Sequence, residues 1–327
     1  MPAGAGRVCR RSRRAPARRG HLRMTAAVSV VVPAYNAEAT LEGALVALLA
    51  QDYPAERYEV IVVDNGSTDR TPAIAARFAP RVQTLREARR GASAARNAGI
   101  LAARHPYVAF TDADCVPDRR WLPELVAAAT GPAAADFVGG RIVAHAPRSA
   151  VETFAACLMD QERAIRVYRP PSVVTANLIV RRALFDTIGL FDESLRRGQD
   201  VDLAYRAHFR HGATFAYAER AVVAHVNPRT LPALFRKGIQ HGHAVAGVLG
   251  RHAGDLGELP WQRCVARRQY AAIARAVGAA LGGPAIEATR MEALCRAVFE
   301  AGKQLGVLVG TARAGLPRRR DRRSVPT

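Results

Sequence analysis

The strongest constraint on the fold of this chain is a regular alternation of short apolar segments and helical patterns. Val28–Val32, Tyr58–Val63 and Val82–Leu85 are short runs with β-branched residues, a composition that favours buried strands. After the first run, leucines recur at helical spacing from Leu41 to Leu49. Strands that alternate with helices predict right-handed βαβ units and a mostly parallel sheet. We therefore expect an α/β fold.

One of these apolar runs ends at two carboxylates. Tyr107–Cys115 reads Tyr-Val-Ala-Phe-Thr-Asp-Ala-Asp-Cys, so Asp112 and Asp114 follow the predicted strand directly. In open α/β sheets, ligands bind beyond the carboxyl ends of the strands. Two carboxylates there can hold Mg²⁺ or Mn²⁺ against a phosphate group. Aspartates are also common in turns, so the pair by itself leaves a turn-capping role open.

The alternation continues with predicted helices at Gly91–Ala103 and Asp118–Ala129 and a predicted strand at Phe137–Ala144. The second half of the chain is predicted to be less regular. Its patterns predict helices at Val151–Val167, Arg181–Thr187 and from Gly198 to about His211, and strands at Val173–Val180, Thr214–Tyr217 and Ala221–His225. Helical spacing dominates from Leu231, with a break at His252–Pro260 and two further helices that end near Gly310. We expect an α/β domain at residues 24–230 and a helical C-terminal extension at 231–310.

The charge of the chain is concentrated at its two ends. The formal net charge is +20, but residues 1–23 hold eight arginines, and residues 311–327 hold six arginines against one aspartate. We predict that both ends are basic disordered tails, because they have too little apolar surface to offset the entropy of ordering. Between them, no aromatic stacking platform accompanies a basic groove, which argues against nucleic-acid binding. Peripheral contact with an anionic membrane stays an expectation.

Cysteine content and hydropathy predict the cellular compartment. The five cysteines are scattered and lack the spacing of metal ligands, which predicts a reduced, cytoplasmic protein. No apolar run reaches the ~18 residues of a membrane span, since Arg275 and Glu287 interrupt the most apolar C-terminal region. The N-terminus lacks the apolar segment of a signal peptide, and either Met1 or Met24 is the expected start.

Five motifs, in this order along the chain, resemble the inverting family 2 glycosyltransferases, which have the nucleotide-sugar-binding GT-A fold. They are Val31-Val32-Pro33-Ala34-Tyr35-Asn36, Val62-Val63-Asp64-Asn65-Gly66-Ser67-Thr68-Asp69, Gly91-Ala92-Ser93-Ala94-Ala95-Arg96-Asn97-Ala98-Gly99, Asp112-Ala113-Asp114 and Gly198-Gln199-Asp200-Val201-Asp202-Leu203. The resemblance covers Val28 to about Val245, roughly two thirds of the chain. It implies a GT-A domain with a Rossmann-like sheet flanked by helices.

The resemblance also implies a set of donor-binding residues, namely Pro33, Ala34, Tyr35, Asp64, Arg96 and Asp112. The first three would line the pocket for the base, and the Asp64 carboxylate would accept a hydrogen bond from an N–H of the base. Arg96 would pair with Asp64, Asp112 or the diphosphate, since a guanidinium can bind an anion with two parallel hydrogen bonds. A solvated arginine on a helix is the other interpretation of Arg96.

For the metal, the resemblance places Asp112 near the ribose and assigns Asp114 to a divalent ion, Mg²⁺ or Mn²⁺, that bridges the donor's diphosphate. Such an ion neutralises the charge that develops on the departing nucleoside diphosphate. His225 follows a late predicted strand, where some related enzymes have another metal ligand. A structural histidine fits the sequence equally well, so both interpretations of His225 stay open.

On the acceptor side, Asp200 matches the position of the family's catalytic base, which deprotonates the acceptor hydroxyl. A helix N-terminus favours its ionised form. The chain departs from the family at Gln199, where a glutamate is frequent, so a role of that side chain in binding acceptor or metal is in question. Asn177 and Gln199 are the remaining candidates for the acceptor side.

The sequence therefore predicts a family 2 glycosyltransferase of the hexosyltransferase type that moves a sugar from a UDP- or GDP-sugar to an acceptor hydroxyl with inversion. The acceptor is left open among a glycan, a lipid-linked intermediate and a small molecule. A nucleotidyltransferase is disfavoured because no glycine-rich phosphate loop with a lysine follows the first strand. The other alternative is a nucleotide-sugar-binding protein without turnover, for which Gln199 is the supporting feature.

Overall fold

The computed structural model describes residues 26–256 and 287–315 of the 327-residue chain. The tail predicted at residues 1–23, most of the tail predicted at 311–327, and the helix predicted between the break and the last helix lie outside the described residues.

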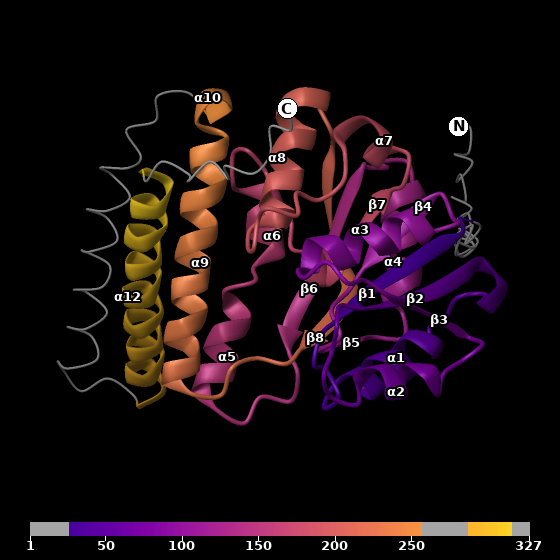
Figure 1. The fold of residues 1–327 in the computed structure, drawn as a ribbon, viewed down its shortest axis with the longest axis horizontal. Helices are drawn as coiled ribbons and strands as arrows, with labels where there is room; N and C mark the ends of the chain where they lie inside the picture. The colour runs from indigo at the N-terminus through magenta and orange to yellow at the C-terminus, as the bar shows by residue number, and fades with distance from the viewer. Residues whose placement is uncertain (1–25, 257–286, 316–327) are drawn as a thin grey trace, which may run out of the picture.

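A single mixed sheet forms the centre of the molecule (Figure 1). Its strands run in the order β3 (Val82–Arg86), β2 (Tyr58–Asp64), β1 (Val28–Ala34), β4 (Tyr107–Phe110), β7 (Leu178–Arg181), β6 (Phe137–Ala144), β8 (Phe215–His225) and β5 (Cys115–Pro117). Strands β1 to β4 are parallel, whereas β7 is antiparallel to both of its neighbours and β5 is antiparallel to β8. The α/β prediction is confirmed, and the regular parallel part is the first half.

Helices cover both faces of this sheet. They are α1 (Leu41–Leu49), α2 (Thr71–Ala76), α3 (Ala92–Ala102), α4 (Trp121–Thr130), α5 (Ala150–Cys157), α6 (Gln161–Arg166), α7 (Leu184–Ile188), α8 (Gln199–His211), α9 (Leu231–Arg251), α10 (Ala253–Leu256) and α12 (Glu287–Gly315), with short 3₁₀ turns at Ala55–Arg57 and Thr175–Asn177. Because side chains alternate along a strand, Val30 and Val32 pack with α1, α2 and α4, while Val31 packs with α3, α7 and α8. The run of valines in β1 therefore serves both layers of the core.

Several predicted boundaries in the second half are wrong. The helix predicted at Val151–Val167 is two helices, because the Asp160 carboxylate accepts the Arg163 N–H at 2.9 Å and starts α6. The two strands predicted after Thr214 are one strand, β8, with an irregularity opposite Gly140 and Arg141. Most of the strand predicted at Val173–Val180 is loop and a 3₁₀ turn before β7. Strand β5 was not predicted, since three residues are too few to show a periodicity.

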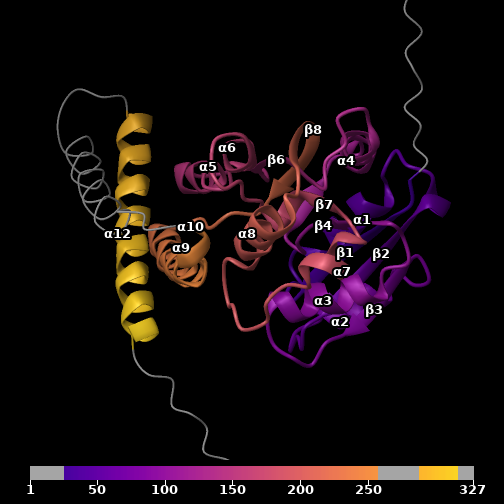
Figure 2. The ribbon, with the colours of Figure 1, turned by 90° about the horizontal axis from the view of Figure 1, so that it is seen from above.

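The extension is built on two helices, α9 and α12, that lie side by side at one end of the molecule (Figures 1 and 2). A Cβ on Gly242 would meet the backbone of Lys303, and one on Gly306 would meet the backbone of Ile239. The two helix backbones are thus in direct contact, which only glycine allows. Helix α12 continues to Gly315 rather than ending near Gly310. Among the described residues, no helix has the length and apolar character needed to span a membrane.

Candidate donor and catalytic site

The ends of β1 and β2 form one edge of the candidate site. Ala34 and Asp64 are register partners at these ends, and the Asn65 N–H donates to the Ala34 carbonyl at 2.9 Å. Asp64 is 4% exposed, and one of its oxygens accepts the Ser67 N–H at 3.2 Å. A cavity of about 320 Å³ beside it is lined by Asp64, Ser67, Pro72, Thr84, Leu85 and Arg86. A carboxylate at the rim of such a cavity can accept an N–H from a nucleobase.

The other residues predicted for the base pocket lie at the same edge. Pro33 and Ala34 end β1, and Tyr35 follows with half of its surface (51%) exposed. The next residue, Asn36, has a positive φ of 48° and accepts the Thr68 N–H at 2.9 Å. This bond joins the loop after β1 to the loop after β2. The predicted base-pocket residues are therefore gathered at one place, with an exposed aromatic ring available to a ligand.

Arg96, in α3, and Asp112, two residues after β4, form an ion pair. The Arg96 Nη2 donates to an Asp112 oxygen at 2.8 Å, and only 7% of the arginine side chain is exposed. Its guanidinium lies 5.9 Å from the centre of the Phe191 ring, and its Nε–H has no partner among the described residues. Of the three partners predicted for Arg96, the structure shows Asp112. The unpaired buried N–H leaves the guanidinium able to bind a further anion.

Asp114 and His225 meet because β5 pairs with the end of β8. The Asp114 carboxylate lies 3.7 Å from His225 Nε2, and the Val226 N–H donates to the Asp114 carbonyl at 3.0 Å. His225 Nδ1 is buried without a hydrogen-bond partner among the described residues. Burial and the neighbouring Asp112 raise the pKa of Asp114, while the charge of His225 opposes this shift. A carboxylate and an imidazole facing each other at this distance suit a divalent cation between them.

Cys115 forms a cluster with Asp114 and His225 but is a poorer ligand for a hard divalent cation. Its Sγ, an Asp114 oxygen and a His225 nitrogen all lie within 4.8 Å of one another. Burial, followed by the charges of Asp112 and Asp114, raises the pKa of the Cys115 thiol well above its ordinary value. Since the thiolate is the form that binds metals, the residues of this cluster that fit Mg²⁺ or Mn²⁺ are Asp114 and His225.

A cation from the extension faces this cluster, and the sequence analysis missed it. Lys237 lies in the second turn of α9 and carries its charge toward Asp114 and Cys115. Burial lowers the pKa of Lys237, and the Asp114 carboxylate opposes that shift. A lysine on an amphipathic helix has no sequence signal that separates it from a solvated one.

Asp200 lies in the first turn of α8, after Gly198. Its carboxylate accepts the Val201 N–H at 2.9 Å, and the Thr175 N–H also contacts it. Burial raises the pKa of Asp200, an effect that the Arg96 charge and these N–H groups only partly oppose. The helix N-terminus thus does not by itself decide the ionisation of this residue. Arg96 interacts with both Asp112 and Asp200, so it links the donor side to the candidate base.

The two residues predicted for the acceptor side are structural in their contacts. Asn177 is fully buried, accepts the Trp121 Nε1–H at 2.8 Å, and donates to the carbonyls of Arg141 and Ala221 at 2.9 and 2.8 Å. All its side-chain groups are therefore used inside the core, and we do not assign it to the acceptor. Gln199 is 7% exposed and donates to the Leu195 carbonyl at 3.1 Å.

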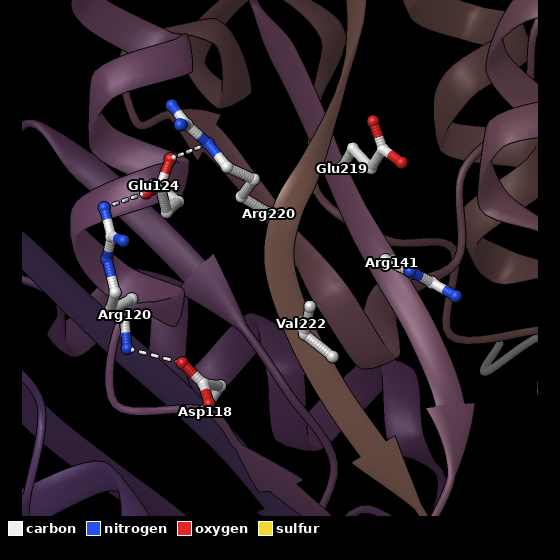
Figure 3. Close-up of a pocket in the computed structure, with 7 residues that line it drawn as sticks. All are labelled: Asp118, Arg120, Glu124, Arg141, Glu219, Arg220 and Val222. Carbon is white, nitrogen blue, oxygen red and sulfur yellow. Dashed lines mark hydrogen bonds and ion pairs between the residues drawn. The ribbon is translucent and has the colours of Figure 1, made fainter.

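A second cavity, of about 350 Å³, lies beside α4 and is lined by Asp118, Arg120, Glu124, Arg141, Glu219, Arg220 and Val222 (Figure 3). Arg120 and Arg220 both point to Glu124, at 2.6 and 3.1 Å (Figure 3). The charges of the residues that line this cavity largely neutralise one another, and none of these residues belongs to the predicted site. We therefore place the site at the strand ends described above.

Carboxylates and a buried arginine at the carboxyl ends of strands, in a mixed α/β sheet flanked by helices, fit the GT-A fold expected from the sequence. Residues 29–189 match the model of glycosyl transferase family 2. An uncharacterized glycosyltransferase of Mycobacterium bovis is 36% identical over 183 residues, which cover 55% of this chain and 78% of that protein. The chain belongs to glycosyl transferase family 2. Asp200, His225 and Lys237 lie beyond the residues matched by the family model.

A further relative agrees with this assignment, and a solved structure shows the same fold. Glycosyltransferase AglE of Haloferax volcanii is 34% identical over 197 residues, 58% of this chain and 64% of AglE. The mannosyltransferase PcManGT from Pyrobaculum calidifontis, solved in complex with GDP-Man and Mn²⁺, has the same fold, with a TM-score of 0.63 and 20% identity over 88% of this chain and 87% of that one. The chain spans less than two thirds of the length of several curated relatives that it matches.

Proposed function

We propose that this protein transfers a sugar from a nucleoside-diphosphate sugar to an acceptor hydroxyl with inversion at the sugar carbon. The observation that carries the proposal is a continuous set of electrostatic interactions. Asp112 interacts with Asp114 at the candidate metal site and pairs with the buried Arg96, and Arg96 in turn interacts with the candidate base Asp200. PcManGT was solved with GDP-Man and Mn²⁺, which supports a nucleotide-sugar donor and a divalent ion here.

In this proposal, Asp114 and His225 hold Mn²⁺ or Mg²⁺, and Asp112 contributes from the donor side. When bound, the ion neutralises negative charge on the leaving diphosphate. Arg96 keeps a free N–H for a phosphate oxygen, and Lys237 adds a second positive charge on the same side. The partly buried Asp200 carboxylate accepts the proton of the acceptor hydroxyl as the oxygen attacks the sugar carbon opposite the diphosphate.

The test is a panel of UDP- and GDP-sugars with the purified protein and Mn²⁺ or Mg²⁺, read by nucleoside diphosphate release and by thermal stabilisation. One donor that is hydrolysed slowly and stabilises the fold selectively would support the proposal. The alternative is a nucleotide-sugar-binding protein without turnover, which Gln199 favours because it replaces a frequent glutamate. It predicts stabilisation by a donor but no release of nucleoside diphosphate with any acceptor.

Substitution of Asp64 tests the base pocket. In Asp64→Ala the nucleobase loses a charged acceptor, so we expect nucleotide affinity to fall about 10- to 100-fold, as for a hydrogen bond to a charged group. Calorimetry with UDP and GDP measures this loss. Asp52→Ala, which removes an exposed aspartate paired with Arg119, is the matched control and should bind as the wild type does. Equal nucleotide affinities in the two variants would mean that the nucleobase binds elsewhere.

We also propose that the basic ends bring the protein to anionic membranes, because each arginine near such a surface contributes about 1 kcal/mol. The protein should sediment with phosphatidylserine vesicles at low salt and dissociate at about 0.5 M salt, where charges are screened. Phosphatidylcholine vesicles are the control. A chain without residues 1–23 and 316–327, which leaves α12 whole, should lose the binding and keep its turnover on a soluble acceptor. Binding that persists in that chain or at high salt would contradict the proposal.

A further inference from the structure

A buried contact between an aspartate and a histidine joins the end of α9 to helix α8. Asp202 and His252 are each 1% exposed, and His252 Nε2 lies 3.0 Å from an Asp202 oxygen. The other ring nitrogen lies 3.2 Å from Asp255, and the ring packs edge-on against Tyr205 at 5.5 Å. Loss of a partner leaves a buried carboxylate strongly destabilised. The contact therefore fixes how α9 lies against α8.

Asp202 is also held by Arg206, one turn further along α8. The Arg206 Nε–H donates to the second Asp202 oxygen at 2.9 Å, while its other N–H groups donate to the carbonyls of Ile188 and, at 2.8 Å, Leu190. These two carbonyls belong to the end of α7 and the loop after it. The Asp202 carboxylate is thus the junction between α7, α8 and α9.

The same turn of α9 holds the loop that leads to the candidate base. Arg251, next to His252, pairs with the Asp192 carboxylate and donates to the Ser194 hydroxyl at 3.0 Å. Both partners lie in the 189–198 loop between α7 and α8.

Helix α9 also packs directly on the residue where α8 begins. Gly198 has a φ of +76°, and a Cβ added there would lie 2.8 Å from Val248 Cγ2 and 3.3 Å from the Ala244 Cβ. Glycine satisfies both the left-handed backbone and the close approach. Asp200 is two residues further on, so a shift of Val248 would be transmitted to the first turn of α8.

These contacts converge on a short piece of chain around Asp200, and they all come from the last three turns of α9. We propose that this part of α9 positions the catalytic base, with His252 and Val248 as positioning residues that never touch the substrate. The inference rests on the proposed function. It makes the C-terminal extension a part of the active-site assembly rather than an appendage to the α/β domain.

The test compares His252→Phe with His252→Gln. Phenylalanine keeps an aromatic ring beside Tyr205 but cannot donate to Asp202, whereas the glutamine amide can replace Nε2 as a donor. Because small misplacements of a catalytic group are costly, we expect kcat of His252→Phe to fall on the order of 10²-fold, with donor dissociation constants within about twofold of wild type. The glutamine variant should recover most of the lost kcat, which a purely structural loss of packing would not predict.

Two variants complete the series. Val248→Ala removes two methyl groups beside Gly198 and is mild enough to fold if His252→Phe does not; its kcat should fall about tenfold with donor affinity unchanged. His211→Phe places the same substitution at the exposed far end of α8 and should behave as wild type.

Wild-type kcat in His252→Phe, or in Val248→Ala where the former does not fold, overturns the positioning role. So does a glutamine variant as slow as the phenylalanine variant. If the wild type itself transfers no sugar from any donor, the proposed function fails and this inference fails with it. If the wild type is active and the variants are equally active, only this inference fails.

Discussion

Replacing Asp200 with asparagine should reduce sugar transfer by roughly 10² to 10⁴-fold while donor binding survives. Asparagine keeps the size of the side chain and its place at the start of α8, but it cannot take a proton from the acceptor hydroxyl. Initial rates at saturating donor, beside calorimetry with the nucleoside diphosphate, measure both effects. Asp186→Asn, the same change at an exposed position in the first turn of α7, should transfer normally.

The raised pKa of Asp200 predicts a pH effect on the transfer rate and another on stability. Because burial raises the pKa of Asp200, the wild-type rate should fall on the acid side at a higher pH than an ordinary aspartate would give. A carboxylate whose pKa is raised by folding binds its proton more tightly in the folded state. Its contribution to the free energy of unfolding therefore decreases as pH rises from the pKa of the unfolded state to that of the folded state. Asp200→Asn should therefore be more thermally stable than wild type at neutral pH.

Normal transfer by Asp200→Asn would place the base elsewhere. A collapse of donor affinity without a change of kcat would make Asp200 a binding residue. Gln199→Glu adds a neighbouring carboxylate and should move the acid limb of the rate profile to still higher pH.

Substitution of Asp114 should have the other large effect. In Asp114→Ala, the candidate metal site keeps His225 but loses the carboxylate that faces it, so Mn²⁺ or Mg²⁺ should no longer strengthen donor binding. We expect turnover to fall about 10²- to 10³-fold, since a metal at a developing charge is worth several kcal/mol. Donor titrations with metal and with excess chelator provide the measurement, and in the variant the two should coincide.

Asp118→Ala is the matched control for this prediction. It removes an exposed carboxylate four residues along the same segment, one that accepts the Arg120 N–H. It should keep both metal dependence and turnover. Full activity of Asp114→Ala, or of wild type in excess chelator, would remove the ion from the mechanism.

The parallel half of the fold and its strand-end residues could be predicted from sequence because each feature is local. Three apolar runs that end in polar loops predict where Ala34, Asp64 and Asp112 lie, since parallel strands bring their carboxyl ends to one edge. The ion pair between Arg96 and Asp112 was among the alternatives that the family resemblance implied, since a guanidinium can bind a carboxylate with two hydrogen bonds.

The parts of the fold and of the candidate site that could not be predicted depend on contacts between segments distant in the sequence. The sequence offers no signal that Lys237 faces Asp114 or that His252 meets Asp202, because both depend on how α9 packs against the domain. Asn177 was predicted for the acceptor side from its place in the chain, whereas its side-chain groups join Trp121 to two backbone carbonyls. The sequence gives no signal of these contacts, because they depend on tertiary packing.

The pairing of β5 with β8 sets the order in which the site can assemble during synthesis. Cys115 pairs with His225, and the described part of the chain gives β5 no other strand partner. At ~5 to 20 residues per second, the ribosome completes β8 roughly 5 to 20 s after β5. The parallel units around Asp64 consist of near neighbours in sequence and can form in that interval, whereas such distant pairings form late. We expect a nascent chain to form the candidate base pocket around Asp64 before the candidate metal site at Asp114 and His225.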